Sequence, residues 1–268
     1  ISSLEKELNA RLFVRNTKEV KLSDDGKDLY RYARQMIDLQ KKIEERFETG
    51  KEESKHLITI AASTIPAQYI LPKILMKFNE RYPKEQVKLL ETDSSQVVTQ
   101  IIDHMVDVGF TGTVLEKKHC KYIPFYKDEL VVITPNTEKY QKLLEDMPDD
   151  ISWIGGEHLI MREEGSGTRK EAGKQLRAAG INLDKLKIIA SIENQETIKK
   201  SVKQGMGISV ISRLAAEDEV KYGDLLAFSI PKADRGRDIN LVYNKNYQMS
   251  KSTERFVKIV KEVYGIEE

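Results

Sequence analysis

The hydrophobic residues follow two different patterns on either side of residue 57. From this point onward, short apolar runs such as LITIAA, QVKLLET and DVGF alternate with segments in which apolar residues recur every three or four positions. Short apolar runs indicate buried strands, and the helical spacing between them indicates amphipathic helices. Strands that alternate with helices form βαβ units with mainly parallel sheets. The sequence therefore predicts an α/β fold for most of the chain.

The first 23 residues predict a short helix and a β-hairpin. Apolar residues at helical spacing in 1–9 are followed by a short apolar run at 12–14, a turn at 16–18 and an alternating run at 20–22. Basic residues on a hairpin next to a helix suit contacts with DNA phosphates. An ordinary solvated hairpin has the same composition, and both interpretations stay open at this point. The candidate DNA-contacting residues are Arg11, Arg15 and Lys18.

A long helix is predicted from Asp24 to Phe47, because the run Ser23-Asp24-Asp25 provides an N-cap. Its apolar residues recur at alternating steps of three and four, which is the heptad pattern of a coiled coil. Such a seam predicts pairing with a partner helix, whereas the alternative is an amphipathic helix that lies on its own domain. The solvated run that follows breaks at Gly50 and indicates a hinge. The seam residues are Leu29, Tyr32, Met36, Leu39 and Ile43.

Small hydroxyl, amide or glycine residues follow four of the predicted strands. Parallel sheets bind ligands beyond the carboxyl ends of their strands, and free backbone N–H groups at helix N-termini attract anions. These positions are therefore expected to bind a small anion, with Arg162 and Arg169 supplying charge. Ordinary N-capping is the alternative for each junction taken alone. The candidate anion-binding residues are Ser63, Thr64, Ile65, Thr111, Gly112, Thr113, Ser166, Gly167, Thr168, Asn194 and Gln195.

Composition and motifs argue against several other classes of protein. Lys and Arg number 44 and Asp and Glu number 43, so the net charge of +1 gives no overall attraction to polyanions, although a local basic patch is compatible with it. The single cysteine, Cys120, excludes an internal disulfide and is typical of a reducing compartment, so we expect a cytoplasmic protein. No apolar run is long enough to span a membrane. No residues have the spacing of a metal site or a catalytic motif, and we expect no catalytic residue, metal or cofactor.

The N-terminal motifs resemble a known DNA-binding module. The sequence reads LEKEL at 4–8, RLF at 11–13, then Arg15, Leu22-Ser23 and Gly26, followed by the long helix. This order and spacing resemble the second half of the winged helix-turn-helix of LysR-type transcriptional regulators. The resemblance implies that the first helix and most of the recognition helix precede Ile1. It also implies that two copies bind a pseudo-palindromic site in double-stranded DNA.

Further along the chain, LITIAAST, ILPKILMKFNERYP, DVGFTGT and QGMGISVISRLAAE resemble the effector domain of the same family. The resemblance implies a partial winged helix-turn-helix and a long linker helix, followed by a two-lobe effector domain that is similar to type 2 periplasmic binding proteins. It assigns residues 1–23 to the DNA-binding part, 24–54 to the linker helix and hinge, 55–134 with 238–268 to lobe I, and 135–237 to lobe II. The chain is expected to cross between the lobes near Ile133–Pro135 and near Arg237–Leu241.

The resemblance favours a regulator that forms homodimers or homotetramers and senses a small anion between its lobes. STIPAQYILP, DVGFTGT and EEGSGTRK are similar to the branch concerned with cysteine and sulfur metabolism, so a sulfur-related effector is expected. Ile65 and Pro66 stand where some members of that branch have Thr and Gln. This difference argues against sulfate itself as the natural effector. The two alternatives are a solute-binding protein without DNA binding, and an α/β enzyme of the same shape that would use Glu163, Glu164 or Cys120.

Overall fold

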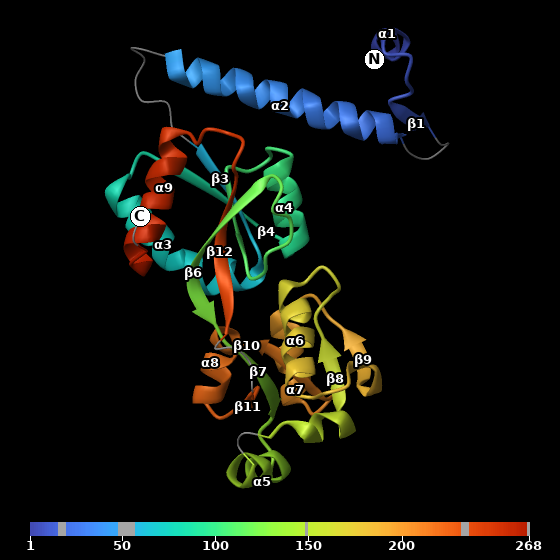
Figure 1. Ribbon diagram of the computed structural model, residues 1–268, viewed down its shortest axis with the longest axis vertical. Coiled ribbons are helices and arrows are strands. Elements are labelled where there is room, and N and C mark those ends of the chain that lie inside the picture. The colour runs from blue at the N-terminus through green and yellow to red at the C-terminus, as the bar shows by residue number, and fades with distance from the viewer. Residues whose placement is uncertain (16–19, 48–56, 148–149, 232–235, 267–268) are drawn as a thin grey trace.

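The first part of the computed structural model consists of a short helix, a β-hairpin and one long helix (Figure 1). The structure describes residues 1–15, 20–47, 57–147, 150–231 and 236–266. The short elements are α1 (Ser2–Glu7), β1 (Phe13–Arg15) and β2 (Val20–Leu22), and the long helix is α2 (Asp24–Phe47). These elements confirm the helix, hairpin and long helix that the sequence predicts. The predicted turn with Lys18 and the predicted hinge at Gly50 lie outside the described residues.

The hairpin packs against the start of α2 at Gly26. The backbone N–H of Ser23 donates to Leu12 O over 3.0 Å, and the Ser23 hydroxyl accepts from Gly26 N–H at 2.9 Å. A Cβ atom at Gly26 would lie 2.0 Å from Leu12 O, far inside van der Waals contact. Only glycine therefore fits between hairpin and helix, which gives a physical reason for the Leu-Ser and Gly pattern of this segment.

Lobe I is built on a five-stranded sheet in the order β4-β3-β5-β12-β6. Its strands are β3 (Leu57–Ala62), β4 (Gln86–Glu91), β5 (Val108–Thr111), β6 (Cys120–Asp128) and β12 (Arg237–Asn244). Its helices are the π-helical turn η1 (Pro66–Ile70), α3 (Leu71–Arg81), α4 (Ser94–Ile102) and α9 (Lys251–Tyr264). Ile60, Phe78, Phe110 and Phe256 form part of the core, each at most 1% exposed. The apolar face predicted for 66–81 thus packs inward, with only Leu75 partly exposed.

Lobe II is built on a second five-stranded sheet, in the order β11-β7-β10-β8-β9. Its strands are β7 (Leu130–Pro135), β8 (His158–Met161), β9 (Lys187–Ser191), β10 (Ile208–Ser212) and β11 (Leu225–Ser229). Its helices are α5 (Glu138–Asp146), α6 (Gly167–Ala178), α7 (Gln195–Lys203) and α8 (Arg213–Lys221), with short 3₁₀ turns η2 (Ser152–Gly156) and η3 (Leu183–Lys185). Leu130, Ile154, Leu159, Leu176 and Phe228 are fully or almost fully buried in its core.

The chain crosses between the lobes earlier than the sequence predicts. β6 belongs to the sheet of lobe I and β7 to that of lobe II, so the first crossing lies at Glu129 rather than near Ile133–Pro135. The second crossing precedes Arg237, which already pairs with Asp128 in lobe I. Residues 130–134 therefore belong to lobe II and Arg237 to lobe I, contrary to the predicted boundaries. The apolar sequence of β7 is compatible with a place in either lobe. Its pairing with β10 and β11 is what assigns it to lobe II.

Both sheets mix parallel and antiparallel pairs, whereas the sequence predicts mainly parallel ones. β3 is parallel to β4 and β5, and β8 is parallel to β9 and β10. The antiparallel pairs all involve β6, β7, β11 or β12, the strands on either side of the two crossings. Three of the parallel strands, β3, β4 and β8, have their carboxyl ends at the space between the lobes.

The seam of α2 is exposed in the single chain. Met36 is 72% exposed and Leu39 is 54% exposed, and Tyr32 and Ile43 are similarly accessible, whereas Leu29 is partly buried. In Figure 1, α2 lies beyond lobe I on the side away from lobe II. One contact with lobe I joins Arg31 Nε to Asp103 Oδ1 over 3.9 Å. The alternative in which the seam is covered by the chain's own domain is therefore wrong for the four exposed residues, Tyr32, Met36, Leu39 and Ile43.

Candidate functional site

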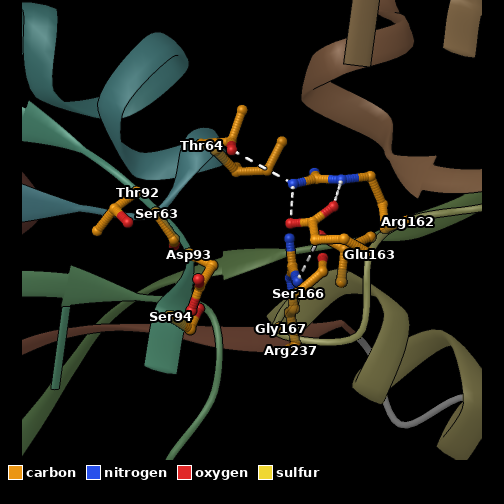
Figure 2. Close-up of a pocket in the computed structure, with 12 residues that line it drawn as sticks. Ser63, Thr64, Thr92, Asp93, Ser94, Arg162, Glu163, Ser166, Gly167 and Arg237 are labelled. Atoms are coloured by element: carbon orange, nitrogen blue, oxygen red, sulfur yellow. Dashed lines mark hydrogen bonds and ion pairs between the residues drawn. The ribbon is translucent and has the colours of Figure 1, made fainter. Parts of the chain in front are cut away.

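The two lobes enclose a small polar pocket at the ends of three parallel strands (Figure 2). Residues 63–65 follow β3 and 92–94 follow β4 in lobe I, whereas 162–168 follow β8 in lobe II. Open α/β sheets bind ligands at this edge. The lining residues are Ser63, Thr64, Ile65, Thr92, Asp93, Ser94, Arg162, Glu163, Ser166, Gly167, Thr168 and Arg237.

Two helices begin at this pocket. Asp93 caps α4 and Ser166 caps α6, and the shortest bonds that their side chains accept from backbone N–H groups measure 2.7 Å and 3.3 Å. Ser94 Oγ is buried and has no hydrogen-bond partner among the described residues. A buried hydroxyl without a partner is unusual in a folded protein. The pocket thus offers an unused donor beside two helix N-termini, whose dipoles favour an anion.

Two glycines allow the lobes to approach each other here. A Cβ atom at Gly167 would lie 2.8 Å from Ser94 Oγ and 3.2 Å from Thr113 Cγ2. A Cβ atom at Gly165 would lie 3.0 Å from Asp93 Cγ. Both glycines belong to lobe II, whereas the atoms that they approach belong to lobe I. The missing side chains at 165 and 167 are therefore what lets the lobes meet at the pocket.

Arg162 is one of the two arginines that line the pocket. Its side chain is 5% exposed, and its guanidinium forms a two-pronged pair with Glu163, with Nε–Oε2 at 2.7 Å and Nη2–Oε1 at 2.8 Å. The Nη2 atom also faces Thr64 Oγ1 across the cleft at 3.5 Å (Figure 2). The cavity that remains is about 10 Å³, which is room for about one water molecule. In this arrangement one edge of the Arg162 guanidinium is already paired with the carboxylate of Glu163.

Arg237 joins the two lobes behind the pocket. Its Nε and Nη2 atoms lie 2.9 Å and 2.8 Å from Asp128 Oδ2, and its Nη1 donates to Thr168 Oγ1 over 3.0 Å. Ser212 donates its hydroxyl to the other oxygen of Asp128. Burial raises the pKa of Asp128, and the neighbouring Arg237 and Ser212 oppose that shift. The network ties both chain crossings to the N-terminus of α6.

The structure brings six of the predicted effector residues together in the pocket and places the others beside it or elsewhere. Thr111 and Thr113 lie next to it, with the Thr111 hydroxyl donating to Thr113 O at 2.9 Å, and Gly112 packs against Arg237. Asn194 caps α7 and Gln195 is buried, but neither lines the pocket. The binding role of all eleven stays a prediction. The six in the pocket are Ser63, Thr64, Ile65, Ser166, Gly167 and Thr168.

Sequence reasoning missed several pocket residues. Thr92, Asp93 and Ser94 follow β4 with the same hydroxyl and cap chemistry as the chosen junctions, so the signal was present. Arg237 lies far from the other lining residues in sequence, and no local pattern marks it. Arg169, expected to supply charge, instead donates from Nη1 to the carbonyl oxygen of Arg162 at 2.9 Å.

The predicted DNA-contacting residues are described only in part. Arg11 is exposed at the start of the hairpin, and the backbone of Arg15 ends β1. Lys18 lies outside the described residues. Their contact with DNA stays a prediction.

Other kinds of site find no support in the residues that the structure describes. Within them, no cluster of three or more His, Cys, Asp or Glu side chains is placed to hold a metal ion. Likewise, none of the helices in the described ranges has an apolar stretch that would cross a membrane. Cys120 is buried outside the pocket, and burial raises the pKa of its thiol to about 11, so it is a poor nucleophile near neutral pH.

A polar pocket between two α/β lobes, joined to a wing-like hairpin and a long helix, defines a ligand-binding domain coupled to a second module. The model of the LysR substrate binding domain matches residues 51–265. The chain therefore belongs to the LysR family of transcriptional regulators, as the sequence motifs indicate.

The similarity to proteins named as transcriptional regulators extends over nearly the whole chain. The chain is 29% identical over 267 residues to the uncharacterized HTH-type transcriptional regulator MJ0300 of Methanocaldococcus jannaschii, which covers 98% of this chain and 88% of that protein. It is 25% identical over 264 residues to the HTH-type transcriptional regulator CysL of Bacillus subtilis. That match covers 98% of this chain and 86% of CysL. The regulatory domain of CcmR from Synechocystis PCC6803, solved in complex with 2-PG, is similar in structure. It has a TM-score of 0.70 and 25% identity, and the match covers 79% of this chain and 98% of that one.

Proposed function

We propose that this chain regulates transcription by binding double-stranded DNA through its N-terminal module and a small anion between its two lobes. The observation that carries the proposal is the guanidinium of Arg162, which is buried among hydroxyl groups at the ends of β3, β4 and β8. A planar guanidinium holds carboxylate, phosphate or sulfur oxyanions by two parallel hydrogen bonds. The N-terminus of α6 and the unpartnered Ser94 hydroxyl add donors without adding charge.

The effector is proposed to be a small metabolite with one oxyanion group, and a sulfur-related anion is the first candidate. The similarity to CysL and the motifs after β3 and β8 support the sulfur-related class. The complex of the CcmR regulatory domain with 2-PG supports a small-molecule ligand more generally. A cavity of about 10 Å³ leaves no space for the whole effector in the present arrangement. Binding must therefore displace Glu163 or separate the lobes.

The DNA-binding part is proposed to act as a dimer. The exposed seam of α2 would pair two chains, so that two hairpins reach neighbouring half-sites. Arg11, Arg15 and Lys18 would then contact phosphates. An anion that binds one arrangement of the lobes more tightly shifts the population of that arrangement, and this difference in affinity is what changes the DNA contacts.

Replacing Arg162 with alanine tests the anion site. At a concentration about 100 times the dissociation constant, a ligand adds about 2.7 kcal/mol to the free energy of unfolding. We therefore expect sulfate, sulfite or phosphate to raise the melting temperature of the unmodified protein by several degrees. Arg162→Ala should lose this shift, because the other cation that lines the pocket, Arg237, is already paired with Asp128.

The matched control is Arg177→Ala, which removes an exposed arginine from the last turn of α6, the helix that begins at the pocket. It should keep the full anion-induced shift. Equal shifts in the Arg162→Ala variant and the unmodified protein would show that the anion binds elsewhere and would refute the proposed site.

A further inference from the structure

The carboxylate of Glu163 occupies the place on Arg162 that an anionic ligand would take. Both of its oxygens lie within 2.8 Å of guanidinium nitrogens, in the two-pronged geometry of a carboxylate ligand. The pair lies in the pocket between the lobes, opposite Thr64 (Figure 2). Because a guanidinium edge binds one carboxylate at a time, Glu163 and a bound anion exclude each other at this edge.

The surroundings allow Glu163 to leave while Arg162 stays in place. The Arg162 carbonyl oxygen accepts from Arg169 Nη1 at 2.9 Å and from Ser191 Oγ at 3.4 Å, so its backbone is held from the other side. The Glu163 side chain is 20% exposed, against 5% for Arg162. A rotation of the glutamate toward solvent would free the guanidinium without moving the strand end that carries it.

We propose that Glu163 is an internal competitor for the effector: it holds the anion site closed in the unliganded chain and is displaced when the anion binds. This inference rests on the proposed function of the pocket, and it assigns Glu163 the role of setting the affinity. When the binding-competent state is only a small fraction of the population, the apparent affinity falls by that fraction. Because Glu163 is adjacent to Arg162 in sequence, its carboxylate always stays near the guanidinium. Only anions that bind the guanidinium more tightly than this carboxylate does would displace it.

The test compares Glu163→Gln with Glu164→Gln. Glutamine keeps the shape of Glu163 but loses its charge, so the internal pair weakens and phosphate or sulfate should bind about tenfold more tightly. Glu164 is the next residue and is exposed, so Glu164→Gln removes the same charge beside the pocket without touching Arg162. Solvent screens that exposed charge, and its loss should change the affinity less than about twofold. Isothermal titration calorimetry of the unmodified protein and both variants, with inorganic phosphate and with sulfate, gives the dissociation constants.

The melting temperature without added anion provides a second readout. Glu163→Gln leaves the buried guanidinium of Arg162 without its counter-charge, so its melting temperature should fall, and saturating phosphate should restore it. Glu164→Gln should melt like the unmodified protein. A change in the general electrostatic potential would raise affinity in both variants and would not produce this loss and recovery.

Two outcomes would overturn the inference, and they separate it from the proposed function. If phosphate binding depends on Arg162 but Glu163→Gln binds no more tightly than the unmodified protein, Glu163 is not a competitor while the pocket remains the anion site. If neither the unmodified protein nor Glu163→Gln shows anion binding that Arg162→Ala abolishes, both proposals fail. Tighter binding in Glu163→Gln alone, with recovery of its melting temperature, supports the competitor role.

Discussion

Replacing Arg237 with methionine is expected to lower the free energy of unfolding by about 3–5 kcal/mol near neutral pH. Arg237 is 4% and Asp128 0% exposed in their side chains, and the two are joined at 2.8 Å. Methionine fills much of the arginine's volume but leaves the Asp128 carboxylate buried without its cation. It also removes the donor to Thr168, which ties lobe I to lobe II. Urea unfolding of the two proteins measures the difference.

The loss of unfolding free energy in Arg237→Met should be larger at high pH than at low pH. Burial already raises the pKa of Asp128, and Arg237 holds that rise in check, so the pKa should rise further in Arg237→Met. A carboxyl group whose pKa is raised by folding contributes stability that is fully present below its unfolded pKa and is lost as the pH rises through its folded pKa. The deficit of the variant should therefore shrink as the buffer is taken from about pH 8 to about pH 5.

Arg213→Met is the matched control. Arg213 pairs with Glu129, the neighbour of Asp128, but both side chains are more than two-fifths exposed. A pair this accessible contributes at most about 1 kcal/mol. If Arg237→Met were no less stable than Arg213→Met, the buried network would not be what holds the two crossings together.

A charge in the exposed seam of α2 is expected to separate the dimer. Leu39→Glu replaces an apolar seam residue that is 54% exposed in the single chain. In a paired helix, this side chain and its counterpart would be buried, and losing the burial of one leucine costs about 1.5–3 kcal/mol. With two copies per dimer, the dissociation constant should rise at least a hundredfold. Analytical ultracentrifugation of the full-length protein over a range of concentrations measures it.

Ile37→Glu is the control on the same helix. Ile37 is 47% exposed and lies outside the heptad seam, so the same kind of substitution should leave the dimer intact. Equal weakening by both variants would mean that charge anywhere on α2 disturbs the helix. No weakening by Leu39→Glu would mean that another surface pairs the chains.

The sequence was most informative where a local pattern fixes local structure. The alternating and helical spacings located the hairpin, α2 and the strands that end at the pocket, because burial of one face imposes those periods. Sequence reasoning did not include β6, α5 and α8 among the expected elements. In β6, the run CKYIPFYKD gives no regular alternation, and Pro124 interrupts the strand pattern.

The pocket was predictable at its strand ends and not at its centre. The run Gly165 to Thr168 signalled a helix N-terminus, and the structure places it there. The pairing of Arg162 with Glu163 depends on the directions of their side chains. These two residues follow the end of a strand, where no regular period sets those directions. The pairing of Asp128 with Arg237 joins residues 109 positions apart, which only the sheet register of β6 and β12 brings together.

A crystal structure of the protein grown with millimolar selenate would test the central claim most directly. Selenate has the shape and charge of sulfate, and its anomalous scattering marks its position without ambiguity. We expect an anomalous peak in the pocket between the lobes, within hydrogen-bond distance of Arg162 and beside Thr64, with Glu163 turned away from the guanidinium. A pocket without a peak, with Arg162 still paired to Glu163 at a selenate concentration that saturates the melting-temperature shift, would contradict it.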